Sequence, residues 1–185
     1  MRIKENEVFS LFNKNGEWES KIIGISKSIV EFKIIKQLRQ KENTKELWLA
    51  FSPIKSNYQN FMIQKATELG VTKFLPIIFE RTIVRKINKE RLEKIVIEAS
   101  EQSNRINVPT VEESQSLNDF FKSNSVDLIF TDLNSNNSKI DKSKLTDRPV
   151  CIVIGPEGDF SEIERGEILN FKGVQPIKIN ENKRK

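Results

Sequence analysis

The chain has 185 residues, 37% apolar and 31% charged, with a formal net charge of +5, one cysteine and no histidine. Histidine general bases, Ser-His-Asp triads and Cys/His zinc sites are therefore excluded from its own residues. No run of about 18 apolar residues occurs, so we expect no membrane-spanning helix. A single thiol, Cys151, flanked by apolar residues, and the lack of a signal-peptide pattern after Met1 predict a soluble, cytoplasmic protein with a buried cysteine.

The amino-terminal part has a β pattern. Three strand-like runs follow one another: Val8–Phe12, 18–25 and 29–35. The Asn15-Gly16 pair between the first two suits a tight hairpin turn. The next stretch, 37–45, is polar and has no apolar period, which predicts a linker. We therefore expect a small antiparallel sheet or barrel over 1–45, with a domain boundary at its end.

From Glu46 onward, strand patterns alternate with helix patterns. The strand-like runs are 47–51, 71–78, 126–130, 150–154 and 174–179. The helical patterns lie over 57–69, after Asn88, over 117–121 and after Ser161. This alternation is typical of βαβ units, so we predict an α/β domain with a mostly parallel sheet over 46–185.

Helix ends and faces are also readable from the sequence. In the 57–69 helix, Phe61, Met62, Ala66 and Leu69 have helical spacing and are the predicted buried face, and Gly70 is a left-handed stop. Asn88 is an expected helix cap. Ser161 and Glu164, three residues apart, have the spacing of a capping box.

The strand at 150–154 runs directly into Gly155-Pro156-Glu157-Gly158 and then into the helix after Ser161. In open α/β sheets, ligands bind beyond the carboxyl ends of strands, where glycines allow close backbone approach. The same turn also suits a rigid connection with nothing bound. It is neither a Walker loop nor a GxGxxG fingerprint.

A second polar group lies near residue 100. Helical spacing would bring Glu98, Glu101, Gln102 and Arg105 to one side of a helix, either as a site that holds a base or as a solvated face. Gln64 to Gly70 forms a third stretch, and its Lys65–Glu68 pair carries little information alone.

Taken together, three stretches resemble the RsmE family of 16S ribosomal RNA uridine N3-methyltransferases. They are Gln64 to Val71 with Pro76 and Arg81; Glu98-Ala99 and Glu101 to Ser103 with Arg105, Val108 and Pro109; and Ile154 to Gly158. The resemblance extends from about Arg2 to Ile179. It implies a PUA-like β-barrel that binds RNA (1–45), followed by a SPOUT α/β methyltransferase domain (46–185) with a trefoil knot, in a homodimer.

The resemblance also implies an activity. Family members transfer the methyl group of S-adenosylmethionine to N3 of one uridine in the decoding region of 16S ribosomal RNA in the 30S subunit. The reaction needs no metal and no covalent enzyme intermediate, so the lack of histidine is compatible with it. It requires a deprotonated N3 held in line with the methyl group.

Site residues follow from matching positions to the family motifs. The implied cofactor-binding residues are Thr131, Asp132, Leu133, Ile154, Gly155, Pro156, Glu157 and Gly158. The implied RNA-binding residues are Arg2, Lys65, Arg81 and Arg105. Arg105 and Glu101 are the candidates for a role in catalysis, no general base is assigned, and a salt bridge from Arg105 to Glu98 or Glu101 is the alternative.

Three departures from the family pattern are visible. Asp159 stands where the family commonly has a second glycine. The barrel lacks the family's first strand, and the segment that threads the knot after the last strand is absent, so we expect a truncated form. A catalytically inactive remnant or a non-catalytic RNA-binding protein is therefore the alternative function, and an unrelated nucleotide-binding α/β domain is a third.

Overall fold

A computed structural model describes residues 4–13, 15–40 and 45–179. The described residues form two compact units. Unit 1 contains those of Met1–Thr44 together with Ser100–Val108, and unit 2 contains those of Lys45–Ala99 and Pro109–Lys185. The segment Ser100–Val108, which the sequence assigned to the second domain, thus groups with the amino-terminal strands.

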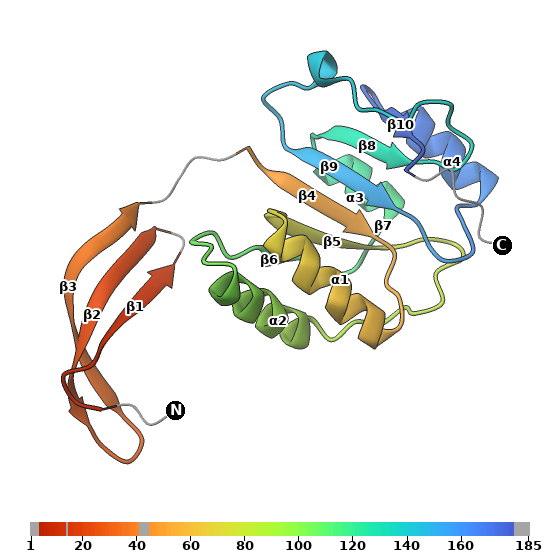
Figure 1. Cartoon of the computed structure of the whole chain (residues 1–185). Helices are drawn as coiled ribbons and strands as arrows, with labels where there is room; N and C mark the ends of the chain where they lie inside the picture. Colours follow the sequence, from red (N-terminus) through yellow and green to blue (C-terminus); the bar gives the residue numbers. More distant parts are fainter. Residues whose placement is uncertain (1–3, 14, 41–44, 180–185) are drawn as a thin grey trace. The chain divides into compact units, whose positions relative to one another are not determined.

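Unit 1 is a three-stranded antiparallel sheet in the order β1-β2-β3 (Figure 1). The strands are β1 (Val8–Asn13), β2 (Gly16–Ile25) and β3 (Val30–Gln40). The linker predicted over 37–45 is wrong at its start, because Gln37 pairs with Trp18 and Arg39 pairs with Glu17 in the sheet. Cross-strand pairing, including the Arg39–Glu17 ion pair, here outweighs the polar composition of the stretch. The rest of it, 41–44, lies outside the described residues.

Ser100–Val108 is held within unit 1 by side-chain hydrogen bonds. The guanidinium of Arg39 donates to the carbonyl oxygen of Asn104 at 3.1 Å and to its Oδ1 at 2.8 Å. Asn104 has a φ of 55°, in the left-handed region that Asn tolerates better than most residues.

Unit 2 is an α/β structure with a parallel sheet in the order β10-β8-β9-β4-β5-β6, and β7 pairs with β5. Its strands are β4 (Leu47–Phe51), β5 (Lys73–Ile78), β6 (Thr110–Val111), β7 (Gln115–Ser116), β8 (Asp127–Thr131), β9 (Val150–Ile154) and β10 (Gln175–Ile177). Its helices are α1 (Ser56–Glu68), α2 (Lys89–Gln102, which runs into unit 1), α3 (Leu117–Ser123), the short 3₁₀ turn η1 (Lys142–Lys144) and α4 (Glu162–Leu169). The predicted fold class is therefore confirmed, and no described helix is long and apolar enough to cross a membrane.

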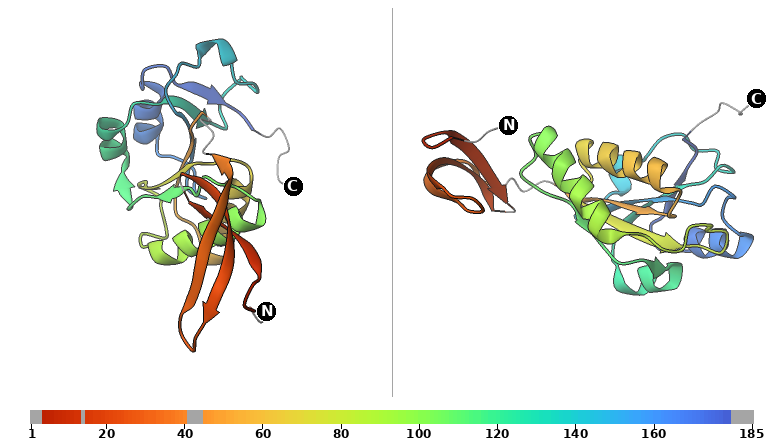
Figure 2. Two further views of the ribbon diagram at one scale, coloured as in Figure 1. Left: turned by 90° about the vertical axis from the view of Figure 1, so that its left-hand side faces the viewer. Right: turned by 90° about the horizontal axis from the view of Figure 1, so that it is seen from below.

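Helices cover both faces of the sheet: α1 and α2 lie on one face, and α3 and α4 lie on the other (Figure 2). Both faces of the central strands are apolar, as expected for a parallel sheet buried on two sides. In β4, for example, Trp48, Leu49, Ala50 and Phe51 are all buried.

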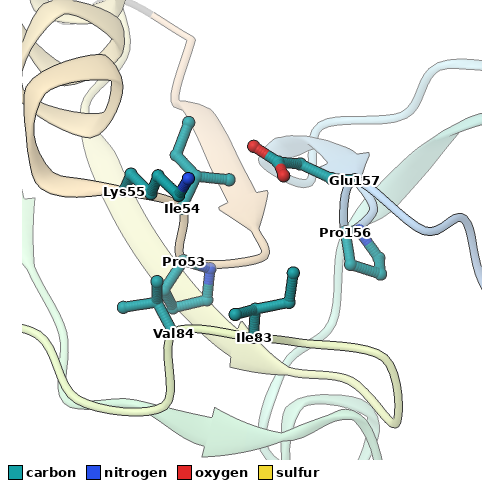
Figure 3. A pocket seen from close by; sticks show the side chains of 7 residues that line it. All are labelled: Pro53, Ile54, Lys55, Ile83, Val84, Pro156 and Glu157. Atoms are coloured by element: carbon teal, nitrogen blue, oxygen red, sulfur yellow. The ribbon is translucent and has the colours of Figure 1, made fainter.

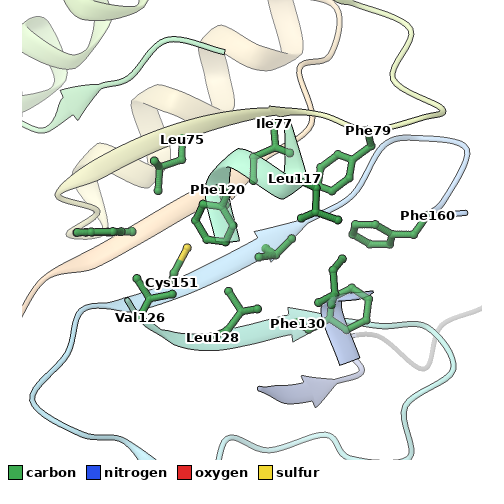
Figure 4. Close-up of a cluster of buried hydrophobic side chains, with 14 residues drawn as sticks. Leu75, Ile77, Phe79, Leu117, Phe120, Val126, Leu128, Phe130, Cys151 and Phe160 are labelled. Atoms are coloured by element: carbon green, nitrogen blue, oxygen red, sulfur yellow. The ribbon is translucent and has the colours of Figure 1, made fainter. Parts of the chain in front are cut away.

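The core between the sheet and helices α3 and α4 is rich in aromatic residues (Figure 4). The ring of Phe160 packs edge-on against Phe79 and Phe130, with centroids 5.1 and 5.0 Å apart. Cys151 lies in this core, and burial raises the pKa of its thiol to about 12. The prediction of a buried, unreactive cysteine is confirmed.

The apolar face predicted for α1 is buried only in part, since Met62 and Ala66 are half-buried. Phe61 and Leu69 are exposed, and the buried residues are Gln59, Ile63 and Thr67. Gln59 is buried because its Oε1 accepts a hydrogen bond from the Ile54 amide at 3.1 Å. A polar residue used in this way is invisible to apolar periodicity.

The predicted helix ends are confirmed. The Asn88 side chain accepts a hydrogen bond from the Arg91 amide at 3.0 Å, and Gly70 has a φ of 109° after α1. Ser161 and Glu164 form the predicted capping box at the start of α4. Each of these features depends on residues only a few positions apart, so the sequence alone was enough to predict where these helices begin and end.

Candidate functional site

The carboxyl ends of the parallel strands in unit 2 surround a pocket, which we call the carboxyl-edge pocket. It has a volume of about 260 Å³ and is formed by the segments that follow β8, β9 and β10. Its lining consists of Thr131, Asp132, Leu133, Gly155, Pro156, Glu157, Asp159, Phe160 and Ile179. The position agrees with the rule that ligands of open α/β sheets bind beyond the carboxyl ends of strands.

Gly155 is required by the packing of the loop after β9. A Cβ atom at Gly155 would overlap the buried ring of Phe160, which would have to move to admit it. A Cβ at Gly158 would make an ordinary 3.8 Å contact with Arg81. Gly155 therefore has to be a glycine so that Phe160 can pack in the core, whereas Gly158 has room for a Cβ atom.

Asp159 occupies a left-handed position, with a φ of 64°. Glycine adopts this conformation without steric cost, and aspartate tolerates it better than most residues. The Oδ1 of Asp159 accepts a hydrogen bond from the Phe160 amide at 2.8 Å. The residue that departs from the family pattern thus retains a compatible backbone conformation.

Asp132 is buried beside the pocket and is bound from two directions. Arg165 on α4 donates from Nη2 to Oδ2 at 2.9 Å and from Nε to Oδ1 at 3.3 Å. The Asn134 amide donates to Oδ1 at 3.0 Å. Burial alone would raise the pKa of Asp132, but these hydrogen bonds and the charge of Arg165 outweigh it, and the pKa lies below its ordinary value.

The loop after β5 also reaches the loop after β9. Nη1 of Arg81 donates to the carbonyl oxygen of Gly158 at 3.0 Å, and the Glu80 amide donates to Oε1 of Glu164 at 2.7 Å. Thr82 accepts a hydrogen bond from the Phe79 amide and shares another with Ser52 at the end of β4. Three strand-end loops are thereby linked to one another.

A second, smaller hollow of about 20 Å³ is also lined by Pro156 and Glu157 (Figure 3). Its other lining residues are Pro53, Ile54, Lys55, Ile83 and Val84. Apart from the side chains of Lys55 and Glu157 its walls are apolar, and Ile83 is largely exposed to solvent. Pro156 and Glu157 therefore contribute to both concave surfaces.

Most of the residues predicted to bind a cofactor line the carboxyl-edge pocket. Two do not: Ile154 ends β9 and accepts a hydrogen bond from the Ser52 amide, and Gly158 faces Arg81. Asp159 also lines the pocket, although the sequence analysis named it only as a departure from the family pattern. Sequence reasoning missed Phe160, Ile179 and Arg165 altogether. Phe160 follows the Gly-Pro-Glu-Gly turn closely enough to have been suspected, but nothing local indicated the other two.

The remaining predicted residues are spread over both units. Lys65 on α1 pairs with Glu68 at 2.8 Å, and Arg2 lies outside the described residues. The prediction that Arg105 shares a helix face with Glu98, Glu101 and Gln102 is wrong, because α2 ends at Gln102 and the left-handed Asn104 redirects the chain. Arg105 is half-buried in unit 1, and burial lowers the pKa of its guanidinium.

The chain is similar to known RNA methyltransferases. The RNA methyltransferase domain family matches residues 41–182. The ribosomal RNA small subunit methyltransferase E of Rickettsia conorii is 32% identical over 186 residues, covering 98% of this chain and 76% of that protein. The Aquifex aeolicus protein of the same name is 28% identical over 181 residues, covering 95% of this chain and 78% of that protein.

The chain belongs to the RsmE family.

Solved structures agree with this membership. An RsmE structure from Neisseria gonorrhoeae bound to S-adenosylmethionine has a TM-score of 0.88 and 26% identity, covering 98% of this chain and 78% of that one. A methyltransferase structure from Legionella pneumophila, also in complex with S-adenosylmethionine, has a TM-score of 0.79 and 27% identity over the same shares of the two chains. The predicted SPOUT fold is thus confirmed for this RsmE family member.

Proposed function

We propose that this protein methylates ribosomal RNA of the small subunit with S-adenosylmethionine as methyl donor, at N3 of one uridine in the decoding region of 16S RNA. The carboxyl-edge pocket is the observation that supports this proposal most strongly, because it lies beyond the carboxyl ends of the strands, where open α/β sheets bind ligands, and most residues of the predicted cofactor set line it. The relatives named for small-subunit RNA methylation support the substrate class.

The pocket residues suit S-adenosylmethionine. Leu133, Pro156, Phe160 and Ile179 offer apolar walls for a flat adenine ring, and the backbone of the loop after β9 offers hydrogen-bonding groups. The volume of about 260 Å³ is just below the range of roughly 300–1,000 Å³ typical of small-molecule sites, so part of the ligand would stay in solvent. When bound, the cofactor supplies an activated methyl group.

Arg81 is the best-supported RNA contact. Its guanidinium lies at the pocket-forming loop, where Nη1 donates to the Gly158 carbonyl oxygen. The other N–H groups of the guanidinium can bind a phosphate or a base carbonyl. Arg105, Arg2 and Lys65 are the other proposed RNA-binding residues. For catalysis we retain Arg105 and Glu101 as candidates: a cationic Arg105 would stabilise the uracil anion formed when N3 loses its proton.

The two units suggest a division of labour. We assign RNA binding to a PUA-like module over 1–45 and methyl transfer to 46–185, acting on RNA within the 30S subunit and hence in the cytoplasm. A homodimer is the proposed assembly, and the exposed apolar residues Tyr58, Phe61 and Leu69 on and after α1 are compatible with a surface that a second copy covers.

Cofactor binding is the first test. Calorimetric titration with S-adenosylmethionine should give saturable binding, and Leu133→Arg, which places a cation in the pocket wall, should weaken it by tenfold or more, an order-of-magnitude figure equal to about 1.4 kcal/mol. Ile163→Arg is the matched control, because Ile163 is 73% exposed against 63% for Leu133 and lies outside the pocket lining. Equal affinities of the two variants would contradict the assignment of the pocket.

Methyl transfer is the second test. Purified 30S subunits lacking the modification are incubated with the protein and labelled cofactor, and the product is located by primer extension, since a methyl group on uracil N3 blocks base pairing. A stop at one uridine is the expected result. Salt-dependent RNA binding with neither cofactor binding nor transfer would favour the non-catalytic RNA-binding alternative.

A further inference from the structure

The Asp132–Arg165 ion pair joins two walls of the carboxyl-edge pocket. Asp132 belongs to the segment after β8, and Arg165 lies on α4, the helix that begins directly after the loop of β9. The side chain of Asp132 is 5% exposed and that of Arg165 is 29% exposed. The pair therefore links the two segments at the wall of the pocket, of which Asp132 is itself a part.

The bonds around Asp132 also order its own segment. Its carboxylate accepts the Asn134 amide, its carbonyl oxygen accepts the Ser135 amide at 3.1 Å, and its amide donates to Ile177 of β10 at 2.9 Å. With Arg165 in place, the turn from Thr131 to Ser135 is held between β10 and α4. Thr131 and Leu133, which flank Asp132, both line the pocket.

We propose that Arg165 is a positioning residue, which holds the segment from Thr131 to Ser135 against α4 and thereby keeps the cofactor pocket in its binding shape. The proposal rests on the proposed function for its cofactor but not for the positioning itself. Arg165 lies outside the pocket lining, so its effect on binding is transmitted through Asp132.

The other edge of the same sheet supplies a matched control. There the buried Asp127, at the start of β8, pairs with Nη2 of Arg148 at 2.8 Å, and the side chains are 3% and 36% exposed. The two pairs have the same composition, nearly the same length and similar burial. They differ in position, because Arg148 precedes β9 and the pocket follows it.

The experiment compares Arg165→Met with Arg148→Met by hydrogen exchange and by calorimetry with S-adenosylmethionine. We expect Arg165→Met to speed exchange of the Asn134 and Ser135 amides and to weaken cofactor binding by about tenfold or more. Arg148→Met should leave both quantities within about twofold of the unmodified protein, although it removes an equivalent ion pair. Arg165→Lys should recover part of the affinity through its retained charge.

Three outcomes would overturn the proposal: unchanged exchange in Arg165→Met, equal loss of affinity in Arg148→Met, or full recovery of affinity in the double variant Asp132→Asn/Arg165→Met. The last would mean that an unpaired carboxylate, and not lost positioning, had caused the defect. If the unmodified protein binds no cofactor while Arg165→Met still speeds exchange, the proposed function fails and the positioning by Arg165 stands.

Discussion

The parallel sheet in unit 2 has a buried Asp–Arg ion pair at the amino ends of its strands, the amino edge, and another at their carboxyl ends, the carboxyl edge. The surroundings of the two pairs differ. At the amino edge, Asp127 is bound by Arg148 and by the amide and hydroxyl of Thr146, whose carbonyl oxygen accepts Lys45 Nζ. At the carboxyl edge, Asp132 of the equivalent ion pair lines a pocket. A buried aspartate paired with arginine thus holds the segment before β9 at one edge and forms part of a pocket wall at the other.

The largest expected effect belongs to the carboxyl edge, where the pocket loop is continuous with the core. Gly155→Val should lower the free energy of unfolding by about 3 kcal/mol, because its side chain would displace Phe160 from between Phe79 and Phe130. Urea denaturation followed by circular dichroism measures this. Gly158→Ala is the control and should change stability by less than about 0.5 kcal/mol; equal effects would show that the loop does not discriminate between its glycines.

The next effect tests whether the two ion pairs are equivalent in stability. Arg148→Met and Arg165→Met should each cost about 2 kcal/mol, below the roughly 3–5 kcal/mol for a fully buried pair because each arginine is partly exposed. Thermal and urea unfolding of both variants provides the measurement. A difference above about 1 kcal/mol between the two variants would show that the two ion pairs do not contribute equally to stability.

The pH dependence of stability should be smaller and should come from both edges. Burial would raise the pKa of Asp127, but hydrogen bonds from Thr146 and Arg148 and the arginine charge leave it below its ordinary value, as for Asp132. Because both folded-state pKa values are lower than the unfolded value of about 3.9, this stability is present above that pH and is lost as pH falls through the folded values.

In Asp127→Asn and Asp132→Asn, the decline in unfolding free energy below about pH 4 should therefore be shallower than in the unmodified protein. Urea titrations at pH 7, 5, 4 and 3 would measure it. An unchanged decline in both variants would assign acid sensitivity to other carboxylates.

The smallest expected effect concerns Asp159 in the pocket loop. Asp159→Ala should cost about 1 kcal/mol, because alanine lacks both the tolerance for a φ of 64° and the hydrogen bond to the Phe160 amide. Asp159→Gly should be neutral within about 0.5 kcal/mol, since it relieves the backbone while losing that bond. Destabilisation by glycine equal to that by alanine would mean that the hydrogen bond matters more than the conformation.

Several parts of the fold could be read from the sequence because their signals are local. The bounds of β9, Val150–Ile154, agree with the apolar run, and the capping box of Ser161 and Glu164 needed only residues three apart. The alternation of strand and helix patterns was enough for the fold class. The family motifs added the pocket-lining residues after β8 and β9, which no periodicity would have joined.

Other parts depend on contacts between residues far apart in the chain. The polar residues of β3 after Lys36 are strand because β2 pairs with them, and Gln59 is buried on α1 because a backbone amide needs its oxygen. The sequence by itself determined an α/β protein of the RsmE type with a Gly-Pro-Glu-Gly loop after β9. Only the tertiary structure decided that Arg165 pairs with Asp132, 33 residues away in the chain, because packing across the sheet sets which charges meet.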